Sequence, residues 1–253
     1  MKSVIHPDFE NIRAELVSLI KGDYTPLKTF CNKRNTVELV SVAGRKMVLK
    51  KYKPNGWVTG LIYTLFRKSK ARRAYEHAIT LTSLGFDTPQ PIAYFEDKRA
   101  GIFRQGYFVC DYADLPSVEQ IFYSDKERLN KDEHLKMAHS LSRYTLSLHN
   151  AGVLPLDFNT GNILFCKAGD KYDFTLIDIN RMKFGKIPGL KKAMISFFQL
   201  GTYPHDYLGL LEPYVWERQF NFEEALYEVL KLRRKQSRWR RFKGFFKPAK
   251  KSL

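Results

Sequence analysis

Three polar side chains, Asp157, Asn162 and Asp178, have the types and the spacing that phosphoryl transfer needs. Asn162 follows Asp157 by five residues and opens an apolar run at 163–166, and Asp178 ends the next apolar run at 174–177. A loop carboxylate can orient an alcohol and accept its proton, and Mg²⁺ prefers oxygen ligands. The three residues therefore predict transfer of the γ-phosphoryl group of ATP to an alcohol. Asp157 is the candidate catalytic residue, and Asn162 and Asp178 are the candidate metal ligands.

Each of these residues also has a structural interpretation. Asp157 could bond backbone amides of its own loop, and Asp178 could cap the turn after a strand. Asn162 could occupy the left-handed corner of a turn, since Gly161 precedes it. The register of all three with the apolar runs favours the catalytic interpretation.

The loop, a strand lysine and the Leu-Ile-Asp run resemble the protein-kinase-like superfamily. Within it, the small size, the basic character and the run Ile-Asp-Ile-Asn-Arg at 177–181 most resemble the Kdo/WaaP family of lipopolysaccharide core kinases. The resemblance covers roughly residues 28–220. It implies an α+β, two-lobed fold with a small β-rich N-lobe, a mainly helical C-lobe and a nucleotide cleft between them. The expected segments are an N-lobe at 1–112, a C-lobe at 113–230 and a basic aromatic tail at 231–253.

The resemblance also implies a nucleotide-binding lysine in the second strand of a hairpin predicted over 36–52. Side chains alternate along a strand, so Val48 and Lys50 share one face and Lys51 points away. Val48 would cover the adenine, and Lys50 would bridge the α- and β-phosphates. A pair of solvated strand lysines is the alternative, and Lys50 is preferred to Lys51 for its apolar neighbour.

Glu76 is the one acidic residue in a helix predicted over 70–84. The resemblance implies that Glu76 points inward, pairs with Lys50 and holds the ammonium towards phosphate. The alternative is a surface pair with Arg72 or Arg73, which lie about one helical turn away.

The sequence departs from the usual kinase pattern in four places, and these departures limit the class of acceptor to be expected. Pro155 stands two residues before Asp157 in place of histidine, Ile179-Asn180 replaces Phe-Gly, and no Ala-Pro-Glu motif follows. These three argue against a regulated protein kinase and favour a small-molecule or glycolipid acceptor. The fourth is a nucleotide loop without glycine, so the side chains of Lys33 or Arg34 could meet the phosphates. A basic surface hairpin is an equally good interpretation of that loop.

The bulk composition points to an acidic partner. The chain has 253 residues with 44% hydrophobic content and a net charge of +17, which suits an anionic membrane, a nucleic acid or a phosphorylated substrate. Three widely spaced cysteines form no metal or redox motif, and a reducing compartment fits them. The first residues lack the apolar core of a signal peptide, so a cytoplasmic location is expected, with possible peripheral attachment to the inner membrane.

The C-terminal tail interleaves basic and aromatic residues at helical spacing, as a helix in a lipid headgroup layer does. The residues expected to meet an anionic membrane are Arg233, Arg234, Arg238, Trp239, Arg240, Arg241 and Phe242. A solvated tail that packs its aromatic residues on the C-lobe is the alternative. No nucleic-acid-binding fold is recognised.

The leading hypothesis is a kinase that uses ATP and Mg²⁺ to phosphorylate a sugar hydroxyl, of Kdo or heptose, in the lipopolysaccharide inner core. Its partner would be the core glycolipid acceptor at the cytoplasmic membrane face. The alternatives are a kinase of another acceptor, of aminoglycoside-phosphotransferase or RIO type, and a non-catalytic pseudokinase scaffold. The sequence says nothing of the oligomeric state.

Overall fold

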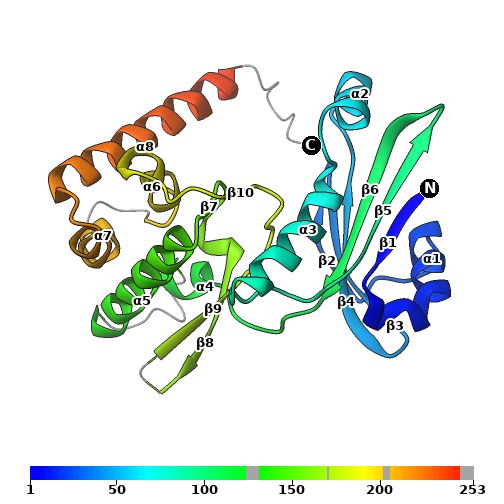
Figure 1. Cartoon of the computed structure of the whole chain (residues 1–253), viewed down its shortest axis with the longest axis horizontal. Helices are drawn as coiled ribbons and strands as arrows, with labels where there is room; N and C mark the ends of the chain where they lie inside the picture. Colours follow the sequence, from blue (N-terminus) through cyan, green and yellow to red (C-terminus); the bar gives the residue numbers. More distant parts are fainter. Residues whose placement is uncertain (124–130, 170, 202–205, 246–253) are drawn as a thin grey trace, which may run out of the picture. The chain divides into compact units, whose positions relative to one another are not determined.

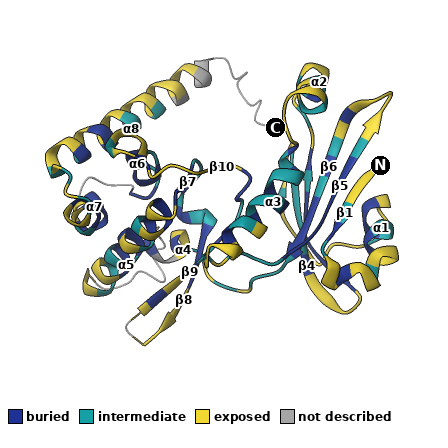
Figure 2. Ribbon diagram, in the orientation of Figure 1, coloured by how far each residue is buried: buried dark blue, intermediate teal, exposed yellow. Residues whose placement is uncertain are grey.

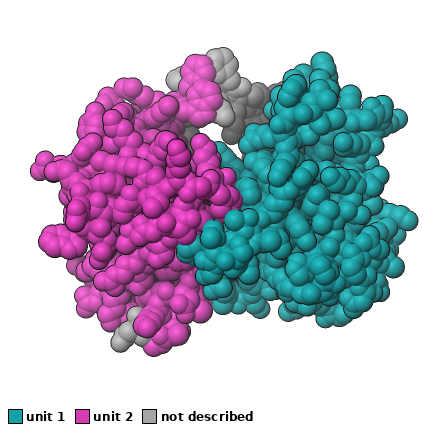
Figure 3. Space-filling view, viewed as in Figure 1, with its two compact units in different colours: residues 1–115, 175–181 teal, residues 116–174, 182–253 magenta. Residues whose placement is uncertain are grey.

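The computed structural model describes residues 1–123, 131–169, 171–201 and 206–245. It divides into two compact units, coloured separately in Figure 3. Unit 1 comprises residues 1–115 and 175–181, and unit 2 comprises residues 116–174 and 182–253. Unit 1 is β-rich and unit 2 is mainly helical, as predicted. The segment 175–181 belongs to unit 1, although sequence order had placed it in the C-lobe.

Unit 1 is built on a six-stranded sheet with the order β1-β5-β6-β4-β3-β2 and antiparallel neighbours (Figure 1). Its strands are β1 (Lys2–Ile5), β2 (Lys28–Asn32), β3 (Thr36–Val42), β4 (Arg45–Tyr52), β5 (Pro91–Arg99) and β6 (Ile102–Asp111). Its helices are the 3₁₀ helix η1 (Pro7–Ile12), α1 (Arg13–Lys21), α2 (Trp57–Leu65) and α3 (Lys70–Ser83).

Two apolar clusters lie on the opposite faces of this sheet. Residues of η1 and α1 pack with Met47 and Leu49 on one face, and residues of α3 pack with Tyr52 and Phe108 on the other. The predicted hairpin over 36–52 is confirmed as β3 and β4. The predicted helix is confirmed as α3, with Ser69 accepting a hydrogen bond as its N-cap.

Unit 2 contains helices around a buried core. The helical elements are α4 (Val118–Tyr123), α5 (Lys131–Asn150), the 3₁₀ turn η2 (Thr160–Asn162), α6 (Leu190–Phe197), α7 (Asp206–Glu217) and α8 (Phe222–Phe245). Two two-stranded sheets pair β7 (Val153–Pro155) with β10 (Met182–Phe184), and β8 (Ile163–Ala168) with β9 (Lys171–Leu176). The long helix predicted at 132–149 is confirmed as α5, and its residues Met137, Leu141 and Leu148 are fully buried.

Helix α8 runs without a break through the boundary that the sequence had suggested at 230/231. The tail is therefore the second half of one helix as far as Phe245. Residues 246–253 of the predicted tail and the side chain of Arg240 lie outside the described part of the chain. Within the described ranges, no helix is both long enough and apolar enough to cross a bilayer.

Candidate active site

Strand β4 presents Val48, Lys50 and Tyr52 on the sheet face that α3 covers. Val48 and Tyr52 both belong to the apolar cluster of that face. Lys51 points to the opposite face, where its ammonium lies 3.1 Å from the carboxylate of Glu38. The predicted alternation is therefore confirmed, and the ion pair with Glu38 gives Lys51 a structural role that Lys50 does not have.

Lys50 is buried, with a relative exposure of 9%. In the described part of the chain no hydrogen bond or ion pair reaches its ammonium. The neighbouring strand places Cys110 close by, where burial raises the pKa of the thiol to about 11 against the opposing charge of Lys50. A buried ammonium without a counter-ion is unfavourable. Lys50 is therefore a candidate ligand for an anion.

Glu76 does not pair with Lys50. Its two carboxylate oxygens accept hydrogen bonds of 2.8 Å from Lys68 Nζ and Arg72 Nε. Burial opposes ionisation of Glu76, but these two cations lower its pKa overall. The predicted Lys50–Glu76 pair is therefore wrong, because Arg72 lies one turn away on the same helix face and takes the carboxylate. The surface pair considered as the alternative is what forms.

The segment that contains Asp178 is hydrogen-bonded to the rest of unit 1 before and after this residue. Thr88 Oγ1 donates to the carbonyl of Leu176 at 2.8 Å. The ring of His77, on α3, contacts the carbonyl of Ile179 at 2.8 Å through Nδ1, which must carry the proton because a carbonyl only accepts. Burial lowers the pKa of His77. These bonds fix the backbone around Asp178.

Asp178 itself has a left-handed backbone, with φ of +54°. A non-glycine residue rarely adopts this conformation, which occurs at functional sites where the surroundings enforce it. Its Oδ1 accepts a 2.6 Å hydrogen bond from Asn180 Nδ2. The side chain of Asn180 also reaches the buried hydroxyl of Tyr52, on β4. Burial and the charge of Asp178 raise the pKa of Tyr52 well above its ordinary value.

Positive charge gathers around Lys70, which the charge of Asp178 also reaches. The cations Arg34, Arg73 and Arg181 all act on Lys70, and Arg181 also acts on Arg73. The ammonium of Lys70 lies 5.8 Å from the ring centroid of Tyr52. Burial and the charge of Arg34 lower the pKa of Lys70, against the opposing charge of Asp178. Arg73 Nε is buried without a hydrogen-bond partner in the described ranges, and burial is the main cause of its lowered pKa.

The glycine-free loop 33–35 joins β2 to β3. Arg34 is exposed, and its charge acts on Lys70. Lys33 is also exposed, and its backbone amide donates to the carbonyl of Asn35 at 3.2 Å. Of the two predicted phosphate ligands, Arg34 is the one that lies near the cationic group.

The loop that contains Asp157 lies in unit 2 and is organised by Asn159 and Asn162. Asn159 Oδ1 accepts from the amide of Gly161 at 3.1 Å, and the amide of Asn162 donates to the carbonyl of Asn159 at 2.9 Å. Asn162 Nδ2 donates to the backbone carbonyl of Asp157 at 3.0 Å. This bond orients the amide so that Asn162 Oδ1 is left for another ligand. A Cβ on Gly161 would lie 2.8 Å from a carboxylate oxygen of Glu119.

A buried chain of side chains braces this loop in place of the missing histidine. Ser196 Oγ donates to the carbonyl of Pro155 at 3.3 Å and lies 3.1 Å from His149 Nε2. His149 Nδ1 lies 2.7 Å from the hydroxyl of Tyr214, to which Arg218 donates at 3.0 Å. His149, Ser196 and Tyr214 are fully buried.

The donor and acceptor of each hydrogen bond in this series of side chains follow from the pKa of His149. Burial lowers the pKa of His149 to about 3, so the ring is neutral and carries one proton. Ser196 donates its proton to the carbonyl, so it must accept from Nε2, and Nδ1 must accept from Tyr214. The bonds run from Arg218 through Tyr214, His149 and Ser196 to the carbonyl of Pro155, two residues before Asp157.

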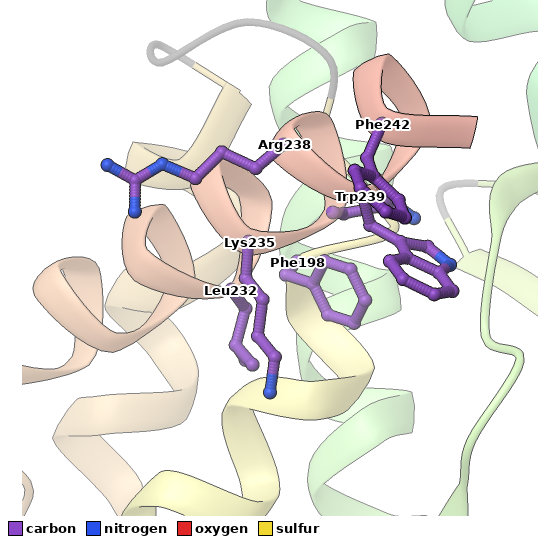
Figure 4. A pocket seen from close by; sticks show the side chains of 7 residues that line it. Phe198, Leu232, Lys235, Arg238, Trp239 and Phe242 are labelled. Atoms are coloured by element: carbon purple, nitrogen blue, oxygen red, sulfur yellow. The ribbon is translucent and has the colours of Figure 1, made fainter. Parts of the chain in front are cut away.

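Helix α8 borders a cavity of about 730 Å³ in unit 2, shown from close by in Figure 4. Its lining is mainly apolar and includes Phe198, Leu232, Trp239 and Phe242. Trp239 and Phe242 stack with ring centroids 5.9 Å apart. The guanidinium of Arg233, one of the residues expected to meet a membrane, donates to the carbonyl of Gly201 and the hydroxyl of Tyr207. Arg234, Arg238 and Arg241 are exposed.

The oxygen donors fit Mg²⁺ in kind. Asp178 offers a carboxylate in unit 1, and, separately, Asn162 offers an amide oxygen in unit 2. Each is an oxygen ligand of the kind that Mg²⁺ prefers. No group of three or more His, Cys, Asp and Glu residues able to hold a metal occurs in the described ranges.

Sequence reasoning did not assign Lys70 and Arg73 to the site. Their basic cluster is visible in a stretch without acidic residues between Glu38 and Glu76, but only the fold shows that the charges of Asp178 and Arg73 both act on Lys70. Sequence reasoning also missed the buried chain that ends at Pro155, because its members come from three distant helices and a strand.

The comparisons with known proteins agree with this architecture. A family model described as the lipopolysaccharide kinase (Kdo/WaaP) family matches residues 32–191. Among solved structures, "WaaP in complex with acyl carrier protein" is similar with a TM-score of 0.64 and 16% sequence identity, covering 94% of this chain and 98% of that chain. None of the curated proteins compared matches the sequence.

The fold is that of a protein-kinase-like phosphotransferase, with a β-rich N-terminal unit and a helical C-terminal unit. Since the family model matches more than half of the chain, this protein belongs to the lipopolysaccharide kinase (Kdo/WaaP) family, and it is a kinase.

Proposed function

We propose that this kinase uses ATP and Mg²⁺ to phosphorylate a sugar hydroxyl, of Kdo or heptose, in the lipopolysaccharide inner core. The observation that carries the proposal is that the family match at 32–191 includes Lys50, Asp157, Asn162 and Asp178. The cations gathered around Lys70 and the unpaired ammonium of Lys50 support a polyphosphate ligand.

In the proposed reaction the acceptor hydroxyl oxygen forms a bond to the γ-phosphorus as the bond from that phosphorus to the bridging oxygen of ADP breaks. Asp157 orients the hydroxyl and takes its proton. Asn162 and Asp178 would hold Mg²⁺, which neutralises charge on the phosphates. The buried chain from Arg218 to Pro155 fixes the backbone that carries Asp157.

We assign the nucleotide phosphates to side chains in place of a glycine-rich loop. Lys50 from β4, Lys70 and Arg73 from α3, and Arg34 from the β2–β3 loop supply the positive charge. Arginine forks suit phosphate oxygens, and the unpartnered Nε of Arg73 is a donor that such an oxygen would satisfy. Lys33 stays a candidate on the edge of this group.

Transfer of labelled γ-phosphate from ATP to purified core glycolipid tests the proposal. Asp157→Asn should reduce the rate by about 10²–10⁴-fold, as loss of a positioned proton acceptor does. Asp173→Asn, at an exposed position on β9, is the matched control and should retain full activity. Equal transfer to peptides or aminoglycosides would overturn the acceptor class, and undiminished activity of Asp157→Asn would overturn the assigned role.

The location and the partners are part of the same proposal. A glycolipid acceptor places the enzyme at the cytoplasmic face of the inner membrane, and the exposed Arg234, Arg238 and Arg241 of α8 support attraction to anionic lipid. An acyl carrier protein is bound in the similar WaaP structure, and a carrier protein of this kind is a proposed partner here. Co-elution of the purified proteins on gel filtration would test that partner.

A further inference from the structure

Helix α2, with Phe66 after it, exposes large apolar side chains on the surface of unit 1. Figure 2 colours parts of the α2 ribbon as exposed. The relative exposures are 74% for Trp57, 52% for Val58, 42% for Ile62, 61% for Leu65 and 84% for Phe66. Single exposed apolar residues are ordinary on proteins, but five on ten consecutive residues form a contiguous patch. A patch of this kind indicates an interaction surface.

The opposite side of α2 is fixed to the sheet. A Cβ on Gly60 would lie 2.6 Å from the carbonyl oxygen of Phe103, so the helix backbone touches β6. The amide of Phe103 donates to Thr64 Oγ1 at 2.8 Å, and the rings of Tyr63 and Phe103 meet edge to face at 5.4 Å. At about 100° per residue, the exposed apolar side chains occupy roughly the other half of the helix circumference. The apolar face is therefore held outward by the packing beneath it.

Positive charge borders the apolar face. Lys53 precedes the helix and Arg67 follows it, and both are exposed. The chain has no acidic residue between Glu38 and Glu76. Trp, Phe and Leu side chains bordered by Lys and Arg match the surface of an anionic bilayer, where apolar groups enter the acyl boundary and cations meet the headgroups. A second protein surface would have to be both apolar and acidic to match equally well.

We infer that α2 with Phe66 is a membrane-docking surface, which inserts Trp57 and Phe66 into the interfacial layer of an anionic lipid bilayer. The helix lies in the plane of the membrane and does not cross it. This surface is distinct from the basic side of α8. Its lipid binding needs neither ATP nor acceptor, although its biological use rests on the proposed glycolipid substrate.

Co-sedimentation of the full chain with vesicles tests the inference. We expect binding to phosphatidylcholine vesicles that contain phosphatidylglycerol, weaker binding without it, and weakening by salt. The double variant Trp57→Ser, Phe66→Ser should lose at least about tenfold in partition, since each large apolar side chain leaves the lipid. The control Trp216→Ser removes an equally large side chain that is 83% exposed on α7 and should bind like the wild type.

The position of the tryptophan gives a second measurement. In a chain whose other two tryptophans are replaced by phenylalanine, dibrominated lipid should quench Trp57 fluorescence. Unchanged partition of the double variant, or no quenching of Trp57, would overturn the inference. Self-association that depends on Trp57 and persists without vesicles would also overturn it, because the face would then join two copies of the chain.

Kinase assays separate this inference from the proposed function. The double variant should phosphorylate a lipid-free core oligosaccharide at the wild-type rate and lose activity on vesicle-embedded glycolipid. A wild-type enzyme inactive on both acceptors would overturn the proposed function and leave the vesicle result to decide the docking surface.

Discussion

The buried His149 gives a stability prediction that can be worked through quantitatively. Burial, with a smaller contribution from Arg218, lowers the pKa of His149 to about 3 in the folded protein. The unfolded chain should have the ordinary value of about 6.5. Between these values the unfolded state binds more protons, so the free energy of unfolding is highest above pH 6.5 and falls as the pH falls towards 3.

The size of the effect follows from proton linkage. Between about pH 7.5 and pH 5.0, this one group should lower the free energy of unfolding by about 2 kcal/mol. The variant His149→Gln retains a donor at the Nε2 position, so it can still bond Ser196. Glutamine does not titrate, and the variant should lack this part of the pH dependence while being less stable at pH 7.5.

Urea unfolding of both proteins at the two pH values measures the difference directly. Every other titrating group is common to both proteins and cancels in the comparison, so only the change in slope is interpreted. The reasoning fails if the wild type and His149→Gln lose the same free energy of unfolding on acidification. Equal losses would mean that the folded protein accepts a proton on the ring.

Three further predictions concern the site and its support. Lys50→Met should reduce kcat/KM for ATP by about 10²-fold. Lys51→Met breaks the ion pair with Glu38 on the other face of the sheet and should leave the kinetics nearly unchanged. Steady-state assays compare the two variants. Gly60→Ala should destabilise the fold by about 1–3 kcal/mol in urea unfolding, because the new methyl group meets a backbone carbonyl at 2.6 Å. Ser196→Ala should lower the free energy of unfolding by about 2–4 kcal/mol, because it leaves a carbonyl and an imidazole proton unpaired at the base of the catalytic loop. It should also lower kcat more than it changes KM. A stability loss with normal kcat would exclude the bracing role.

Local sequence patterns correctly predicted the strands and helices that are determined by residues close together in the sequence. The hairpin over 36–52 and the helices at 70–84 and 132–149 follow from alternation, helical spacing and turn residues, and all three were confirmed. The choice of Lys50 over Lys51 needed only the period of two along a strand. Such features depend on residues within a few positions of one another.

Features that depend on distant residues could not be predicted. The predicted pairing of Glu76 with Lys50 was wrong. Only the positions of the side chains show that Lys68 and Arg72 bind its carboxylate instead. Nothing local in the stretch 57–66 showed that Gly60 would lie against β6 and leave the larger apolar side chains exposed. The strands and helices of the first 27 residues have no strong pattern of their own and form against β5 and the sheet face.

The assignment of residues 175–181 to unit 1 has a consequence for synthesis on the ribosome. The first 115 residues emerge without the segment that carries Asp178 and bonds to Thr88 and His77. Unit 1 can complete its fold only after most of the intervening chain has been translated, so the two units cannot mature strictly one after the other. A gene fragment that ends at residue 115 would encode the six-stranded sheet without Asp178. Cutting the chain there would separate Lys70 from the carboxylate whose charge acts on it.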